Sequence, residues 1–185
     1  KSAPAAKSVS AADFTIKSGN IVTDYTGSSK DVVIPDGIVE IAEDAFLGKD
    51  IKSIVVPEGV KTIGSNAFAS CEDLTKVVLP STLTKLGDNA FECCTFLESI
   101  VIPDGCKEIG ADCFTNCSSL KDIYVPASVT KIGDDAFCTF YEAMVIHTVK
   151  GSKAEACAKE NSYKVDYKAA PGTAAKKATT TPAKT

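Results

Sequence analysis

The chain has 185 residues, of which 44% are apolar, and a formal net charge of −4. This length suits one domain of ordinary size, and the apolar fraction is sufficient for a continuous core. The mild negative charge gives no electrostatic support for binding a phosphate backbone, so we expect no nucleic-acid partner. No apolar run approaches the roughly 20 residues that a membrane-spanning helix needs, which predicts no membrane insertion within this chain.

The composition also argues against catalysis. His147 is the only histidine and the chain has no tryptophan, which excludes most histidine-based mechanisms and multi-histidine metal sites. His147 has no evident cysteine or serine partner, and we interpret it as a surface residue. The acidic residues follow repeat positions and do not gather in pairs of differing environment. We therefore predict that the protein is not an enzyme, and we expect no cofactor and no metal.

The chain begins with two segments of different character. Residues 1–12 are rich in alanine, serine and lysine without an apolar period, and we predict that they are flexible. Residues 13–31 are predicted to form an N-terminal cap. Within the cap, Phe14 to Ile16 and Ile21 to Val22 flank the turn sequence KSGN, which predicts a β-hairpin that covers the open end of the following repeats.

Residues 32–144 contain an internal repeat, the first feature to look for in a chain. Prolines recur at spacings of 22, 23, 23 and 23 residues, and a phenylalanine follows each proline after eleven residues. Small and aliphatic residues keep the same register between them. The two columns are Pro35, Pro57, Pro80, Pro103 and Pro126, and Phe46, Phe68, Phe91, Phe114 and Phe137.

Each repeat reads as a strand, a proline stop, a short second extended piece and a tight turn. Alternating apolar residues precede each proline, as in Leu74, Val77 and Leu79; this L-x-x-L-x-L pattern is typical of leucine-rich repeats. Proline ends a strand because it cannot donate to the ladder. One repeat cannot bury its apolar face alone, but stacked copies can, at about 4.8 Å per strand. We predict a leucine-rich-repeat solenoid, mostly β, with parallel strands, about five 23-residue repeats and a stack of phenylalanines inside.

The end of the chain predicts a helical cap and then a tail. Ser152 precedes Glu155 by three residues, a capping-box pattern that opens a helix through KAEACAKEN. Residues 145–168 are expected to form this cap, with Ala154, Cys157 and Ala158 facing the last repeat and residues 163–167 returning as a strand. Residues 169–185, rich in threonine, proline and lysine, are predicted to be a flexible linker or tail. They lead to further domains or a cell-wall attachment, or they form a disordered terminus.

The repeat resembles a known family. The sequence VIPDGCKEIGADCFTNCSSLKDI at residues 101–123 is similar to the BspA-type leucine-rich repeat, and the resemblance extends over about residues 31–146. It implies a secreted or cell-surface location and, in the best-known members, adhesion to host proteins or other cells. The resemblance supplies no catalytic residue set.

Five of the eight cysteines stand where the repeat requires a small apolar side chain. Three share one column, and two replace other apolar residues; they are Cys71, Cys94 and Cys117, then Cys106 and Cys113. Free cysteine packs as a small hydrophobe, so we interpret these residues as buried thiols. A disulfide framework is the alternative for a surface protein. Cys93 and Cys138 lie outside these columns and are the candidates for exposed, reactive thiols.

An acidic or amide residue stands two positions before each phenylalanine: Asp44, Asn66, Asn89, Asp112 and Asp135. Such side chains cap turns by accepting backbone N–H groups, which is our interpretation of this column. A calcium site at Glu43 and Asp44, or at Asp134 and Asp135, is the alternative, although one acidic pair per turn supplies few of the oxygens that calcium needs.

The outward faces of the strands supply the candidate binding site. The residue two before each proline is expected to point outward, which aligns Val33, Val55, Val78, Val101 and Tyr124 in an apolar row that we call the valine ribbon, with Lys76 and Asp122 beside it. Exposed apolar patches mark contact sites, although β-branched residues also simply favour strands.

The ribbon predicts a binding function, and the family resemblance implies the surface location and the adhesive role. We predict a non-catalytic protein-interaction module, extracellular or on the cell surface, that binds a protein or glycan ligand and takes part in adhesion to host or other cells. A structural spacer or self-assembling surface subunit, with homo-oligomer contacts, is the alternative. A regulatory or targeting domain of a larger surface enzyme is a third possibility.

Overall fold

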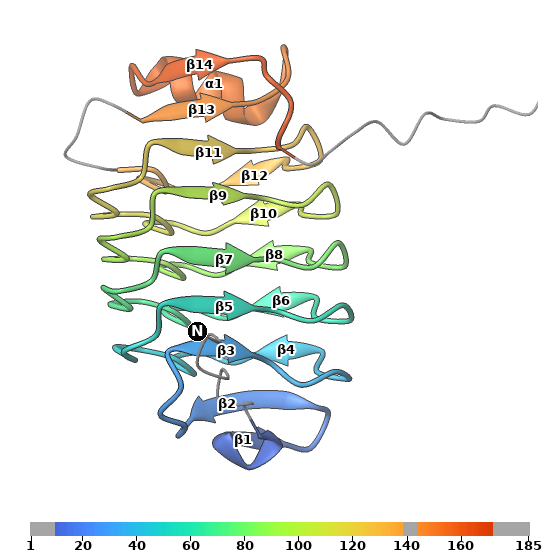
Figure 1. Ribbon diagram of the computed structural model, residues 1–185. Coiled ribbons are helices and arrows are strands. Elements are labelled where there is room, and N and C mark those ends of the chain that lie inside the picture. Colours follow the sequence, from blue (N-terminus) through green and yellow to red (C-terminus); the bar gives the residue numbers. More distant parts are fainter. Residues whose placement is uncertain (1–9, 139–143, 172–185) are drawn as a thin grey trace, which may run out of the picture.

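The computed structural model describes residues 10–138 and 144–171. Within these residues the chain winds into stacked turns, and successive turns add strands to two faces of one elongated body (Figure 1). This architecture confirms the predicted leucine-rich-repeat solenoid. Most of the expected flexible segments, residues 1–9 and 172–185, lie outside the described residues. Ala11–Asp13 forms a 3-10 turn capped by the Ser10 side chain.

A hairpin closes the N-terminal end of the core, as the sequence predicts. Strands β1 (Phe14–Lys17) and β2 (Ile21–Tyr25) pair antiparallel, and the turn between them contains Asn20 at φ 58°. The rings of Phe14 and Tyr25 are buried and lie 6.4 and 5.4 Å, centroid to centroid, from the ring of Phe46. The hairpin therefore covers the first ring of the phenylalanine stack.

One face of the solenoid is a continuous sheet. Among the described residues it has seven strands in the order β1-β2-β4-β6-β8-β10-β12, and from β2 onward the neighbours are parallel. Its short strands are the predicted second extended pieces, β4 (Glu40–Ile41), β6 (Thr62–Ile63), β8 (Lys85–Leu86), β10 (Glu108–Ile109) and β12 (Lys131–Ile132). Because β2 pairs parallel with β4, the hairpin also starts a further turn before the five repeats seen in the sequence.

The other face carries the strands that precede the prolines. These five strands are β3 (Asp31–Val33), β5 (Ser53–Val55), β7 (Lys76–Val78), β9 (Ser99–Val101) and β11 (Asp122–Tyr124). Two further strands without a following proline, β13 (Val145–His147) and β14 (Lys164–Asp166), continue the same face. All pairs are parallel, but the described strands form two sheets, β3-β5-β7 and β9-β11-β13-β14. The ladder of this face is interrupted between β7 and β9, which we call the seam.

The core is a stack of aromatic rings, as the spacing of the phenylalanines predicts. The ring centroids of neighbouring repeats lie 4.9, 5.2, 5.6 and 6.1 Å apart from Phe46 to Phe137, and every ring is at most 1% exposed. Aliphatic residues from both faces surround this stack in one continuous cluster. Burial of apolar area at about 25 cal/mol per Å² drives the stacking of the repeats.

The tight turns before the phenylalanines require a left-handed backbone. All five residues of the acidic and amide column have positive φ, between 51° and 60°. Asparagine and aspartate tolerate this conformation better than other L-residues. The column is therefore explained by backbone conformation, in addition to the turn capping that the sequence predicts.

A helix closes the C-terminal end. Helix α1 (Lys153–Glu160) begins after Ser152, whose hydroxyl accepts the Glu155 N–H at 3.1 Å. The Glu155 carboxylate does not complete the predicted capping box at Ser152, because it accepts the N–H of Gly151 instead. Ala154 and Ala158 are fully buried and Cys157 packs against the core, as expected. The returning strand is β14.

Candidate functional site

Cross-strand register aligns the residues of the valine ribbon. Val33, Val55 and Val78 are direct partners in one sheet, and Val101 and Tyr124 are partners in the other. Val33 is 57% exposed and Val78 is 40% exposed, whereas the other three side chains are half-buried. Each ribbon residue stands between two inward-facing residues because side chains alternate along a strand. The structure therefore places all five on the outer surface, on the same side of their strands.

A second row runs beside the ribbon and includes the two predicted polar residues. Lys76 is exposed and lies two positions before Val78; Asp122 is partly exposed and lies two positions before Tyr124. Lys76 is the register partner of Ser53, and Asp122 is the partner of Ser99. The charged groups thus flank the apolar row.

The seam divides the ribbon into two parts. Val78 ends the N-terminal part and Val101 begins the C-terminal part, because no ladder joins β7 to β9 in the described residues. The inward residues Val77 and Leu79 are only partly buried, whereas their counterparts in the other repeats are buried. Leu79 is also the γ-branched member of a column that otherwise holds Ile34, Val56, Ile102 and Val125. β-Branched residues fit a pleated strand better, which accounts for the weaker pairing at this position.

His147 extends the ribbon at its C-terminal end and is not the surface residue that the sequence indicated. Its side chain is 6% exposed, and its ring stacks on Tyr124 with centroids 4.2 Å apart and planes at 11°. Nε2 lies 2.7 Å from an Asp122 carboxylate oxygen, and Nδ1 lies 3.3 Å from a carboxylate oxygen of Asp166. Burial follows from the stacking of β14 on β13. Column-by-column comparison places His147 in the column of Tyr124 but does not predict its burial.

This cluster gives Tyr124 a fixed orientation. The Tyr124 hydroxyl has a pKa raised above its ordinary value, first by desolvation and then by the carboxylates of Asp122 and Asp166. The phenol is therefore neutral at physiological pH and available for hydrogen bonds. Tyr124 combines a flat apolar face with a polar tip, a combination that is enriched in contact surfaces.

The two candidate exposed thiols differ from the buried ones. Cys93 and Cys138 are both half-buried, and Cys157 is a third half-buried thiol that the sequence analysis did not single out as accessible. Cys93 does belong to a column, because it has φ 57° at the position where Ser70 and Asn116 also have positive φ. The Asn116 amide nitrogen lies 3.7 Å from the Cys93 sulfur.

The other five cysteines are buried, as predicted, and all eight are free thiols. In the shared column each thiol donates to a phenylalanine carbonyl of the preceding repeat, at 3.1 to 3.3 Å: Cys71 to Phe46, Cys94 to Phe68 and Cys117 to Phe91. Burial raises the pKa of Cys71 and of Cys117 to about 12. Because the thiolate is the nucleophile, these side chains serve packing and not chemistry.

One exposed aromatic residue escaped the sequence analysis. Phe96 is 58% exposed and stands one position before Leu97, where the neighbouring repeats have Asp73 and Ser119. An apolar residue in a polar column is a signal that column-by-column comparison can detect. Phe96 therefore presents an exposed apolar side chain on the loop before β9.

No candidate metal centre or membrane span emerges from the described part of the chain. Within residues 10–138 and 144–171, no three histidine, cysteine, aspartate or glutamate side chains are grouped as metal ligands. The helix that these residues contain is too short and polar to cross a bilayer.

The stacked parallel strands, proline stops and phenylalanine stack define a leucine-rich-repeat protein. The family described as "BspA type Leucine rich repeat region" matches residues 21–142 in six copies. The chain therefore belongs to the BspA-type leucine-rich-repeat family. The six copies agree with the further turn that β2 begins.

Solved structures show the same fold. The T. pallidum leucine-rich repeat protein (TpLRR) is 34% identical with a TM-score of 0.71, and the match covers 76% of this chain and 71% of that one. A leucine-rich repeat protein from Eubacterium ventriosum is 27% identical with a TM-score of 0.58, covering 75% of this chain and 42% of that one. One from Bacteroides capillosus is 28% identical with a TM-score of 0.50, covering 60% and 91%. This chain thus spans less than half of the Eubacterium protein. A comparison with curated proteins found no match.

Proposed function

We propose that the protein is a non-catalytic interaction module, secreted or on the cell surface, which binds a protein or glycan through the valine ribbon and takes part in adhesion. The observation that carries this proposal is the register-aligned outer row, in which Val33 and Val78 are 57% and 40% exposed. Exposed apolar side chains gathered in one row mark contact surfaces. The family resemblance supports the surface location and the adhesive role.

The geometry of the ribbon suits a broad ligand. Parallel strands present the outer residues at about 4.8 Å intervals, with Lys76 and Asp122 at the margin. An apolar centre with charged residues at its rim resembles the usual anatomy of a protein interface. Tyr124 serves as the aromatic anchor of this surface.

Binding of the fluorescently labelled domain to cultured epithelial cells and to an immobilised extracellular-matrix coat tests the proposal. We expect saturable binding that the double variant Val33→Lys, Val78→Lys weakens by roughly tenfold or more, because each lysine places a charge where the ligand must exclude water. The matched control is Val39→Lys, since Val39 is 41% exposed but lies outside the ribbon.

Two results would count against adhesion through the ribbon. Equal weakening by Val39→Lys would mean that added charge acts without regard to position. Absence of saturable binding to both surfaces would contradict the adhesive role.

Self-assembly is a second candidate, favoured by the ends of the strand face. In the described residues β3 and β14 each have a neighbouring strand on one side only, and an open strand edge is a template for pairing with another chain. Sedimentation of the natural protein over a range of concentrations separates the two functions. Reversible oligomers that Val33→Lys dissociates would support self-assembly.

A further inference from the structure

A groove runs along the end of the strand face where the chain turns at the prolines. It has a volume of about 600 Å³ and extends from Leu79 at the seam to Tyr167 after β14. Its apolar walls come from residues at the ends of β7, β9, β11, β13 and β14, including Val101, Pro103, Tyr124 and Pro126. Val149, which is 53% exposed, lies at the same end as Tyr167.

The chain's own exit segment lies against one part of this groove. After β14 the chain runs past the ends of β13 and β11 (Figure 1), and residues 167–170 line the groove without regular secondary structure. Its small side chains, Ala169 and Ala170, are among these lining residues. The exit segment therefore forms one wall of the groove, and its small side chains leave the space beside the strand ends open.

The seam leaves backbone groups unpaired at the Leu79 end of the groove, away from the exit segment. In the four other repeats the residue before the proline donates its N–H to a carbonyl of the next strand, for example Ile34 to Val55 at 3.1 Å and Ile102 to Tyr124 at 2.9 Å. Within the described residues, the Leu79 N–H has no such acceptor and the Val101 carbonyl accepts no such bond. Both residues line the groove, so the interrupted ladder lies at this end of it.

Charge is distributed unequally along the groove. Glu58 and Asp104, both exposed, line the end near Leu79, whereas Lys168 lies at the end near Tyr167. The Ser81 N–H and hydroxyl donate to the Glu58 carboxylate at 2.9 and 3.0 Å, and these bonds lower the pKa of Glu58. The end near the seam therefore attracts a cationic side chain.

We propose that this groove binds an extended segment of a partner protein, made of small residues and proline, with a lysine or arginine that lies over Glu58 and Asp104. Tyrosine rings and proline faces provide the flat apolar surfaces on which proline-containing segments dock. Such segments are pre-extended and lose little conformational freedom on binding. The inference rests on the proposed interaction function and adds a groove with a defined ligand chemistry, which shares Val101 and Tyr124 with the ribbon.

Fluorescence anisotropy with the full chain tests this site. The probes are two labelled synthetic peptides, Ala-Pro-Ala-Ala-Pro-Ala-Ala-Pro-Lys-Lys and the same sequence ending in Glu-Glu. We expect the lysine peptide to bind saturably. The affinity of the glutamate peptide is expected to be lower by at least roughly tenfold. Asp104→Lys is expected to remove that preference, and Val149→Lys is expected to weaken both peptides by about tenfold.

The repeat supplies a matched control. Asp36 stands in the same Pro-Asp-Gly turn as Asp104 but belongs to the first repeat and does not line the groove, so Asp36→Lys should bind the lysine peptide as the natural protein does. Absence of peptide binding, equal affinity for both peptides, or normal binding by Asp104→Lys and Val149→Lys would overturn the groove proposal. Val33→Lys lies outside the groove and should leave peptide binding unchanged, so failure of the ribbon and failure of the groove are distinguishable.

Discussion

At the scale of single residues, the stacking of the repeats decides which cysteine thiols are accessible to reagents and which are buried in the core. Cys93 and Cys94 are adjacent, yet Cys94 is fully buried and donates to the Phe68 carbonyl, whereas Cys93 is half-buried at a left-handed turn position. Burial raises the pKa of Cys94 well above its ordinary value. These chain neighbours thus have different environments because Cys94 points into the core and Cys93 lies on the turn.

Thiol reactivity should therefore divide the eight cysteines into two groups. We expect a disulfide reagent to modify the native protein at Cys93, Cys138 and Cys157, and to reach the five buried thiols only after unfolding. Mass spectrometry of the modified protein identifies the sites. Cys93→Ser should remove one rapidly reacting thiol and Cys94→Ser should remove none. Rapid native reaction at Cys71 or Cys117 would contradict the packing role of that column.

Close approach between turns explains another column, which holds Gly64, Gly87, Gly110 and Gly133. A Cβ atom built on Gly87 would lie 2.6 Å from the Gly64 carbonyl carbon and the Ser65 nitrogen, which is far inside a normal contact. The first repeat has Ala42 at the equivalent position, where the hairpin and not another repeat turn precedes it. The glycine column is therefore a requirement of stacking.

At the scale of elements, the sequence predicts those strands, turns and helices whose residues follow a periodic pattern. The hairpin, the strands before the prolines, the short second strands, the helix and β14 all follow from local patterns repeated in register. The burial of His147 and the seam between β7 and β9 could not be predicted in this way. Both depend on how neighbouring turns are stacked. At the seam the only sequence signal is that Leu79 replaces the β-branched residue of its column.

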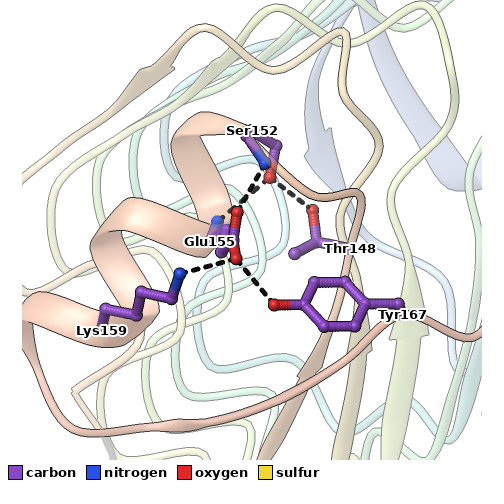
Figure 2. Close-up of polar contacts among 6 residues, drawn as sticks. Thr148, Ser152, Glu155, Lys159 and Tyr167 are labelled. Atoms are coloured by element: carbon purple, nitrogen blue, oxygen red, sulfur yellow. Dashed lines mark hydrogen bonds and ion pairs between the residues drawn. The ribbon is translucent and has the colours of Figure 1, made fainter.

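The C-terminal cap depends on one carboxylate that joins three segments. Glu155 accepts hydrogen bonds from the Lys159 ammonium group at 2.7 Å and from the Tyr167 hydroxyl at 2.6 Å (Figure 2). It also accepts one from the Gly151 N–H. The bonds from Lys159 and Tyr167, followed by that from Gly151, lower the pKa of Glu155 from 4.5 to about 2. The ionised form therefore ties α1 to the turn before it and to the exit segment after β14.

Stability of this cap should depend on pH with a defined sign. A lowered folded-state pKa means that the contribution of Glu155 is fully present above pH 4.5 and is lost as the pH falls to about 2. We expect Glu155→Gln to lower the thermal midpoint at neutral pH, and the difference from the natural protein to shrink across this interval. Circular dichroism measures the midpoint at each pH. Glu160→Gln, an exposed carboxylate on the same helix, is the control; a pH-independent difference for Glu155→Gln would contradict the linkage.

At the scale of the whole molecule, the two faces differ in continuity. The sheet that contains β8 and β10 is unbroken, and the rings of Phe91 and Phe114 stack across the same boundary with planes at 1°. The ladder between β7 and β9 is absent on the other face of the described residues. In a solenoid each repeat contacts only its neighbours, so stability is a sum of repeat and interface contributions. The seam is therefore a site of lower local stability on one face of the solenoid. The continuous sheet on the other face and the stacked rings join the two repeats there.

Hydrogen exchange should detect this weakness directly. We expect the amide of Leu79 to exchange at least roughly tenfold faster than those of Ile34, Val56, Ile102 and Val125, because these four donate to the next strand and Leu79 does not. Leu79→Ile restores the branched side chain of the column and should slow exchange at this position. Amides of the β8–β10 pair are the internal control and should stay protected in both proteins. Equal protection at Leu79 and Ile102 in the natural protein would show that the ladder is closed in solution.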